Sequence, residues 1–388
     1  EAGRVIPKAV KSRRGGDGEA RFSRTIVRTC LESMKSYLSE DASSDANLGA
    51  AQSIAEFRIR SVMCVPLATA DGRPLGAIQL DTQDYGKKFR EEDLKLLTIV
   101  ANFASVAVEK AQVHAALLSR EKQQHEIEIA KKVQLGFLPQ TVPAVPGYEF
   151  FAYYSAAQTV GGDYYDFIPL PGGRIAVVIG DVAGKGVPAS LLMAKLSAEA
   201  RYAMLTQPDP ARAVTLLNEQ IVRGGIGDRF ITFAALVLEP DEHRVTVVNA
   251  GHINPFRVRC PGGTLAEAIT DADSGLPLGL MSGYAYTAVP LELAAGESLL
   301  VFTDGVTDAT GATGAMFGFD GVTRATSDTE LGELGPRGVG ERLVHAVRHH
   351  AGNRPQADDI AIVSFGRPIA DSPTTHSGPA SGAYRPAE

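Results

Sequence analysis

Residues 174–187 read RIAVVIGDVAGKGV, and this stretch organises the larger part of the chain. An apolar, β-branched run at 175–179 leads into Gly180-Asp181, and a glycine-rich turn then precedes a helix-compatible run at 188–201. The pattern predicts a buried strand, a tight turn and a helix. Asp181 would stand at the open end of the strand, where a carboxylate suits metal binding or acid–base chemistry. The pattern equally fits an aspartate that caps the helix.

Three further acidic positions share this setting, since each lies beside glycine or at the end of an apolar run. They are Asp163 after Gly161-Gly162, Asp304 after the run 299–302, and the pair Asp358-Asp359 before the run 360–365. If the fold brings these strand ends together, the carboxylates repel one another, and divalent cations relieve that repulsion. Oxygen ligands without convergent His or Cys favour Mg²⁺ or Mn²⁺. Two such ions can share a carboxylate and a water, whose lowered pKa makes it a nucleophile toward phosphorus.

Length, charge and cysteine content limit the class of protein. A chain of 388 residues, 44% hydrophobic and 21% charged, predicts two or three globular domains. The net charge of −7 disfavours nucleic-acid binding, and no run approaches ~18 uninterrupted apolar residues, so we expect no membrane-spanning helix. Cys30, Cys64 and Cys260 show neither disulfide nor metal-ligand spacing, and we expect each to be a small buried apolar residue. Together these features predict a cytoplasmic protein with no nucleic-acid or membrane partner.

The N-terminal part contains one clear hairpin, because residues 61–81 (SVMCVPLATADGRPLGAIQLD) place a loop between two apolar runs. A helix with an apolar stripe is expected from residue 89, and an earlier one over residues 22–39. With residues 59–62 and 76–80, these segments resemble the C-terminal part of a GAF domain. The resemblance implies an α/β sensory domain over residues 1–112, with part of the domain preceding residue 1. A purely structural dimerisation module fits the residues as well.

A long helix is expected to link this domain to the next, over residues 113–146. Residues 107–138 contain no proline and only one glycine, Gly136. Apolar residues recur at a spacing of about 3.5 at Val106, Val113, Leu117 and Ile127. The matching positions in between are polar, namely Lys110, Arg120, Gln124 and Lys131. We interpret the segment as a signalling helix that pairs with its twin in a homodimer, and a solvated spacer helix remains the alternative.

The second domain covers residues 147–366 and mixes strands with helices. Strands are expected at 148–155, 163–170, 174–182, 230–238, 243–249, 285–291, 298–302 and 360–365. Helices are expected at 188–204, 211–223 and 337–350. This order predicts an α+β fold with helices packed on sheets rather than regular βαβ alternation. Residues 367–388 are rich in Pro, Ser, Thr, Gly and Ala and are expected to be disordered.

The acidic positions lie in four of five motifs that follow one another along the chain: VGGDYYD (160–166), GDVAGKG (180–186), NAGH (249–252), FTDGVTDA (302–309) and ADDIA (357–361). The set resembles PPM-type (protein phosphatase 2C-like) serine/threonine phosphatases, in particular the bacterial sporulation-phosphatase and sigma-factor-regulator branch. The resemblance covers about residues 135–365 and implies an α-β-β-α sandwich.

The resemblance also implies a role for each acidic position. Two ions of Mn²⁺ or Mg²⁺ would be held by Asp163, Asp181, Val182, Asp304, Asp358 and Asp359. Asp181 would bridge both ions, with the Val182 carbonyl on one of them. Asp304 and Asp358 would ligate the first ion and Asp163 the second, and catalysis would depend on Asp181, Asp304 and Asp358. Asp359 is kept as a ligand, although it fits better as a residue that orients its neighbours.

Other motif residues receive weaker roles. Asp166 and Asp308 are expected behind the ligands or at the surface. Asn249 and His252 are expected to make structural hydrogen bonds, with general-acid catalysis by His252 as the alternative. Lys185 lacks the spacing of a phosphate-binding loop and is expected to be a solvated turn lysine. No arginine stands out as a clamp for substrate phosphate.

The resemblance finally implies a substrate and a mode of control. The substrate would be phosphoserine or phosphothreonine on an anti-anti-sigma (STAS) partner, and the GAF-like domain would control activity through the helix. We hypothesise that the dimer geometry of residues 107–138 repositions the helix 188–201 and so completes the metal site. A phosphatase-fold scaffold that binds a phosphoprotein without turnover is the alternative. A kinase is disfavoured because the chain has no glycine loop with a paired catalytic lysine.

Overall fold

The computed structural model describes residues 5–12, 22–42, 58–84, 86–225, 227–259, 264–326 and 335–369. The chain forms two compact units, residues 1–124 and 125–388, and each is described by itself. Cys260 and nearly all of the tail expected to be disordered, from residue 370 on, lie outside the described residues.

The N-terminal unit is built on a three-stranded antiparallel sheet. Its elements are α1 (Arg24–Ser33), β1 (Tyr37–Ser39), β2 (Ser61–Ala68) and β3 (Pro74–Thr82), with strand order β1-β2-β3. The expected hairpin is confirmed by the pairing of β2 with β3. The expected helix over 22–39 is wrong beyond Ser33, because Met34 takes a left-handed conformation (φ 52°) that ends the helix and β1 follows. Cys30 and Cys64 are buried in the core of this unit, as expected.

One helix, α3 (Glu91–Leu135), continues from the first unit into the second without a break at the expected boundary near residue 112. Its early turns expose large apolar side chains, among them Leu96, Ile99, Phe103 and Val106 at 53–76% exposure. An 18-residue window of α3 has a mean hydropathy of 1.3, so by length and composition alone it is the one candidate membrane span in the described part of the chain. The same exposed stripe also suits a helical partner.

The C-terminal unit contains two antiparallel sheets. The strands are β4 (Glu149–Ser155), β5 (Tyr164–Pro169), β6 (Ile175–Val182), β7 (Ile231–Glu239), β8 (Arg244–Ala250), β9 (Phe256–Arg259), β10 (Thr264–Glu267), β11 (Ser274–Gly275), β12 (Val289–Glu292), β13 (Glu297–Phe302) and β14 (Ile360–Gly366). One sheet has the order β10-β9-β13-β14-β4. The other has the order β11-β8-β7-β6-β5, with β12 paired to β8. Sequence analysis missed β9, β10 and β11, which are short strands of two to four residues.

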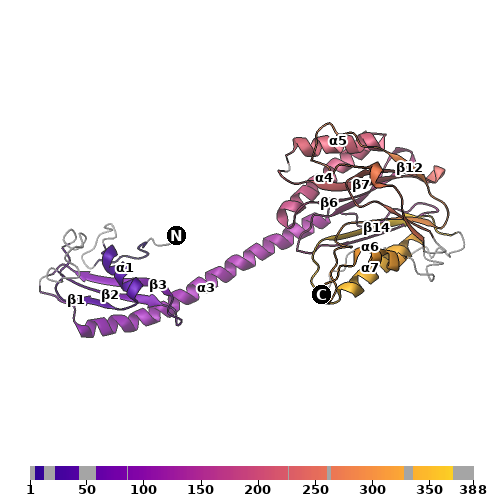
Figure 1. The fold of residues 1–388 in the computed structure, drawn as a ribbon. Coiled ribbons are helices and arrows are strands. Elements are labelled where there is room, and N and C mark those ends of the chain that lie inside the picture. The colour runs from indigo at the N-terminus through magenta and orange to yellow at the C-terminus, as the bar shows by residue number, and fades with distance from the viewer. Residues whose placement is uncertain are drawn as a thin grey trace. The chain divides into compact units, whose positions relative to one another are not determined.

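Helices cover the outer face of each sheet (Figure 1). They are α4 (Val187–Thr206), α5 (Pro210–Arg223), α6 (Gly318–Thr326) and α7 (Pro336–Ala351). Three short 3-10 turns lie between strands, namely η1 (Pro171–Gly173), η2 (Pro240–Glu242) and η3 (Asp271–Asp273). The pair α4 and α5 packs on β5–β8, and α7 packs on β4, β13 and β14. The expected α-β-β-α sandwich is confirmed, although α6 was not expected.

The core explains why the acidic motifs lie where they do. The strand β6 is buried along nearly its whole length, so its apolar run is fixed between α4 and the second sheet. Asp181 is the first residue of β6 that is partly accessible, and Gly186, at φ 72°, then turns the chain into α4, where Pro188 occupies the first turn. Asp181 is therefore the point at which β6 becomes accessible from outside the core.

Candidate functional site

The antiparallel pairing of β5 with β6 brings the first two acidic positions together. Tyr164 lies opposite Gly180, so Asp163 and Asp181 stand at the same end of the sheet. Their carboxyl groups are close enough for each to affect the pKa of the other. Asp163 is only 1% exposed, whereas Asp181 is half-buried.

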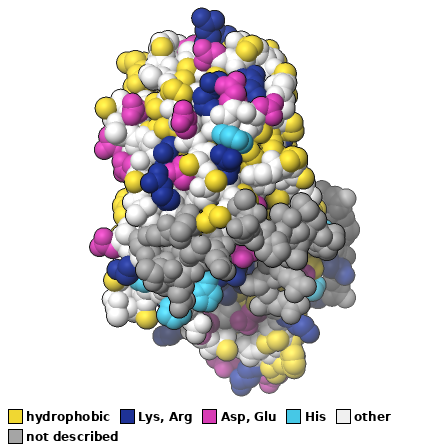
Figure 2. Space-filling model, turned by 90° about the vertical axis from the view of Figure 1, so that its right-hand side faces the viewer, with side chains coloured by type: hydrophobic (Ala, Val, Ile, Leu, Met, Phe, Trp, Pro, Cys, Tyr) yellow, Lys and Arg dark blue, Asp and Glu magenta, His cyan; other side chains and the backbone are white. Residues whose placement is uncertain are grey.

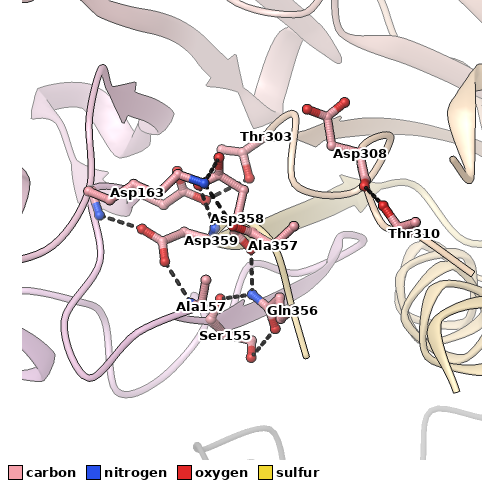
Figure 3. Close-up of polar contacts among 12 residues, drawn as sticks. Ser155, Ala157, Asp163, Thr303, Asp308, Thr310, Gln356, Ala357, Asp358 and Asp359 are labelled. Carbon is pink, nitrogen blue, oxygen red and sulfur yellow. Dashed lines mark hydrogen bonds and ion pairs between the residues drawn. The ribbon is translucent and has the colours of Figure 1, made fainter. Parts of the chain in front are cut away.

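The pairing of β13 with β14 gathers the other acidic positions in the same way. Phe302 lies opposite Ile362, and the Thr303 amide donates to the Ala361 carbonyl at 3.0 Å. Asp304 therefore leaves β13 at the end where Asp358 and Asp359 enter β14. Asp308 follows one turn later, with its amide donating to the Asp304 carbonyl at 2.8 Å. In Figure 3 the Asp308 side chain lies apart from Asp358 and Asp359.

Polar contacts join these two sheet ends into one site (Figure 3). The Thr303 hydroxyl donates to Asp163 Oδ2 at 2.7 Å and accepts the Ala361 amide at 2.9 Å. Asp359 accepts the amides of Ala157 at 2.7 Å and Gly162 at 2.5 Å. The acidic positions predicted from sequence thus lie together, and both oxygens of Asp359 hold the loop that carries Asp163.

The carboxyl groups are poorly neutralised, and their pKa values show it. Burial raises the pKa of Asp163 well above its ordinary range, and the neighbouring Asp181 raises it further. The hydrogen bond from the Thr303 hydroxyl acts in the opposite direction and lowers this pKa. Burial and Asp304 raise the pKa of Asp181 to about 7. Loss of hydration and Asp358 raise the pKa of Asp304, and burial raises the pKa of Asp359 despite its two backbone donors. A cluster of this kind favours the binding of cations.

The donor set fits hard divalent cations. All side-chain donors are carboxylate oxygens, and the Val182 carbonyl lies beside Gly162, where a Cβ would sit 3.0 Å from it. Within the described residues, however, no three Asp, Glu, His or Cys side chains already surround one metal position. Lys185 pairs with Asp358, and backbone amides donate to Asp359. A cation at Asp358 would therefore compete with the Lys185 ammonium.

Lys185 is an exposed turn lysine, as expected, but its ammonium also lies 2.8 Å from Asp358 Oδ2 and donates to the Ala357 carbonyl at 2.7 Å, a partner that was not expected. The turn between Gly184 and Gly186 aims the side chain back toward the acidic cluster. An arginine that the sequence did not single out also lies here, since a Cβ on Gly184 would be 3.7 Å from Arg229 Nε.

Asp166 is an internal residue rather than a surface one. It is 2% exposed and pairs with Arg201 of α4 at 2.5 Å, and the Tyr164 hydroxyl donates to it at 3.0 Å. The ion pair ties α4 to β5, so Asp166 contributes to the frame behind the ligands. Nothing in the motif pattern pointed to Arg201, which lies 35 residues away in the chain.

Asn249 and His252 form a buried turn. The Asn249 side chain accepts the His252 amide and donates to the His252 carbonyl, both at 2.9 Å. His252 Nδ1 pairs with the Thr232 hydroxyl at 2.9 Å, and Thr232 lies opposite Asp181 in the sheet. Burial lowers the pKa of His252 to about 4, so the imidazole is neutral at pH 7. These contacts favour the structural role over general-acid catalysis.

Gln356 is a second residue that the motif analysis passed over. Its amide donates to the carbonyls of Ser155 and Asp358, both at 2.7 Å, and accepts the Ser155 hydroxyl at 3.0 Å (Figure 3). Gln356 thereby fixes the turn before β14 against the end of β4. The only signal in the sequence was its position two residues before Asp358.

Comparison with known families divides the chain in the same way as the structure. Residues 171–368 match the family described as stage II sporulation protein E (SpoIIE), and residues 2–108 match the GAF domain. Asp181, Asp304, Asp358 and Asp359 lie inside the first match. Asp163 precedes it, so its place in the site is argued from the structure.

Curated relatives match over part of their length. Phosphoserine phosphatase RsbU of Bacillus subtilis (strain 168) is 32% identical over 187 residues, which are 47% of this chain and 53% of the relative. Protein IcfG of Synechocystis sp. (strain ATCC 27184 / PCC 6803 / Kazusa) is 28% identical over 220 residues, 50% of this chain and 34% of the relative. This chain thus spans between about a third and a half of these relatives.

Solved structures support the fold of the C-terminal unit. The SiaA-PP2C domain of Pseudomonas aeruginosa is 21% identical with a TM-score of 0.54, and the match covers 64% of this chain and 98% of that domain. The RsbU and RsbW domains of a Mycobacterium tuberculosis protein are 23% identical with a TM-score of 0.50, over 60% of this chain and 63% of theirs. At these identities the likeness concerns the fold, which is of the PP2C type.

Proposed function

The chain belongs to the stage II sporulation protein E (SpoIIE) family and carries a GAF domain before the matching region, and from this premise we propose that it is a metal-dependent protein serine/threonine phosphatase. The observation that carries the proposal is the meeting of Asp163, Asp181, Asp304 and Asp358 from four strand ends of two sheets. Two bound Mn²⁺ or Mg²⁺ ions would supply the activated water that attacks phosphorus.

The residues of the chain have distinct parts in this proposal. Asp181, whose pKa is affected by Asp163, Asp304 and Asp358, would be shared by both ions, with the Val182 carbonyl on one of them. Asp304 and Asp358 would hold the first ion and Asp163 the second. Asp359 is retained as a candidate ligand, but its observed contacts make it first of all the anchor of the Asp163 loop. Arg229, which lies near Gly184, would be the candidate side chain to bind the phosphate of a substrate.

The substrate in this proposal is phosphoserine or phosphothreonine on a regulatory protein of the STAS type. The motif set and the relative named as a phosphoserine phosphatase support it. The GAF domain would control activity, and the exposed apolar stripe of α3 supports a homodimer formed through this helix. The net charge of −7, together with the mixed basic and acidic side chains on the face shown in Figure 2, supports a protein that does not bind nucleic acid, and a cytoplasmic location is part of the proposal.

The experiment is hydrolysis of p-nitrophenyl phosphate by the full chain with Mn²⁺, Mg²⁺ or EDTA, followed by a phosphorylated STAS protein. We expect turnover that requires metal and falls by about three orders of magnitude or more in Asp181→Asn and Asp304→Asn. A folded wild-type protein that binds the phosphorylated partner without turning it over, in the presence of Mn²⁺, would instead establish the scaffold alternative.

A further inference from the structure

The last turn of α3 contains a buried polar side chain that the proposed chemistry does not use. Gln134 is 5% exposed, and its amide makes two hydrogen bonds with one residue of the chain. Nε2 donates to the Gly161 carbonyl at 2.5 Å, and the Gly161 amide donates to Oε1 at 3.1 Å. A primary amide is suited to this task, because it offers one donor and one acceptor side by side.

Gly161 begins the short segment that carries Asp163. The next residue, Gly162, donates its amide to Asp359, and Thr303 donates its hydroxyl to Asp163 itself. The segment has little freedom on its other side, since a Cβ on Gly161 would lie 2.4 Å from the Tyr154 hydroxyl. Three contacts therefore fix the segment, and only the one from Gln134 comes from a helix outside the two sheets.

We propose that Gln134 is a positioning residue of the metal site, which sets the Gly161–Gly162 backbone and through it the Asp163 carboxylate. The inference rests on the proposed function and adds to it a structural link between α3 and the site. Residues that orient a metal ligand contribute to affinity although they never touch the ion. A signal that displaced the last turn of α3 would reach Asp163 through these two hydrogen bonds.

The test uses the full chain with three variants. Gln134→Met keeps the length and approximate volume of the side chain but removes both hydrogen bonds. Gln134→Glu keeps the acceptor for the Gly161 amide and sets a carboxylate against the Gly161 carbonyl. Gln140→Met is the matched control, because Gln140 also closes the end of α3, through the Leu135 and Leu138 carbonyls at 2.8 and 3.0 Å, without touching the Asp163 segment.

Two readouts separate positioning from general stability. We expect Gln134→Met to weaken Mn²⁺ binding, measured by calorimetry, by about 10-fold or more. Its kcat should fall with little change in KM for p-nitrophenyl phosphate. In EDTA, amide exchange at residues 157–163 should accelerate. In Gln134→Glu the Gly161 amide should stay protected while Mn²⁺ affinity still falls. Gln140→Met should leave both readouts as in the wild type.

Wild-type Mn²⁺ affinity and wild-type exchange at residues 157–163 in Gln134→Met would overturn the inference. If Gln134→Met does not fold, the Mn²⁺ affinity of Gln134→Glu decides, and wild-type affinity in that variant would overturn the inference. A wild-type protein that neither binds Mn²⁺ nor hydrolyses phosphate would refute the proposed function. The exchange measurement in EDTA would still decide whether Gln134 holds the segment.

Discussion

Two aspartates three residues apart, at the start of β5, have similar burial and opposite surroundings. Asp163 is 1% exposed and Asp166 is 2% exposed. Asp166 faces the Arg201 guanidinium and receives hydrogen bonds from the Tyr164 hydroxyl and the Phe167 amide. Asp163 receives one hydrogen bond from Thr303 and otherwise faces Asp181, Asp304 and Asp359.

The difference shows how one fold uses a buried carboxylate either for structural stability or for cation binding. A buried carboxylate with its own cation is satisfied within the protein, so its loss exposes an unpaired charge and costs stability. A buried carboxylate among other acids is left unsatisfied by the protein, so the fold carries it at a cost. Asp163 should therefore matter for cation binding and Asp166 for folding.

The largest expected effect comes from exchanging each of the two residues for its neutral isostere. Asp163→Asn should lower metal-dependent turnover by about 100-fold or more, since it removes a ligand. Its thermal midpoint in EDTA should stay equal or rise, because repulsion with Asp181 is relieved. Asp166→Asn should lower the free energy of unfolding by about 1–3 kcal/mol, a value reduced because Arg201 is half exposed.

Calorimetry of both variants in EDTA and turnover per folded molecule in Mn²⁺ measure the two effects. Arg201→Met serves as the control on the other side of the ion pair, and it should resemble Asp166→Asn in stability. Equal activity losses in Asp163→Asn and Asp166→Asn would contradict the assignment of Asp163 to cation binding and of Asp166 to stability.

A smaller effect is expected in the pH dependence of stability without metal. The pKa of Asp181 rises from 3.8 to about 7 on folding. Between these values the folded state binds a proton that the unfolded state has released. The stabilising contribution is therefore complete below about pH 4 and is lost as the pH rises through 7. The thermal midpoint in EDTA should fall by about 5 °C between pH 5 and 8.

The variant Asp181→Asn should flatten this slope, and scanning calorimetry at several pH values measures it. His252 acts in the opposite sense, because its pKa of about 4 removes stability as the pH falls below about 6.5. The comparison of wild type with Asp181→Asn cancels that contribution, since His252 is present in both. The raised pKa values of Asp163, Asp304 and Asp359 contribute a slope of the same sign, so the test is the difference between the two proteins. Equal slopes in wild type and Asp181→Asn would mean that Asp181 does not contribute.

Local patterns predicted an α+β fold with helices packed on sheets and placed the acidic positions at strand ends, whereas the α-β-β-α sandwich and the ligand roles followed from the resemblance to PPM-type phosphatases. The run 175–179 is a buried strand, and the glycine after it must lie at the edge of the core. The motifs at Asp163, Asp181, Asp304 and Asp358 each stand at such an edge, so their strand ends could be listed before any pairing was known. Antiparallel pairing then brought them together.

Residues that act through tertiary contacts were not predictable in this way. Gln134, Arg201 and Gln356 belong to polar stretches, and their partners lie 27, 35 and 201 residues away in the chain. No periodicity identifies a side chain whose role is to satisfy a distant backbone group or charge. The partner of Lys185 was not predictable for the same reason, because Asp358 is far away in the sequence and close in space.

The smallest expected effect concerns Lys185. It forms an ion pair with Asp358, as Arg201 does with Asp166, but Asp358 is more exposed than Asp166. The pair is exposed, with 47% of the lysine side chain accessible, so Lys185→Met should change the free energy of unfolding in EDTA by less than about 1 kcal/mol. Since the ammonium competes with a metal ion for the Asp358 carboxylate, the variant should bind Mn²⁺ about 2- to 5-fold more tightly in calorimetric titrations. Lys185→Arg, which keeps the charge, should bind as the wild type does. Weaker binding in Lys185→Met would show that the lysine orients Asp358 for the ion instead of competing with it, and Asp358 would then belong with Asp166 as a residue whose partner the protein itself supplies.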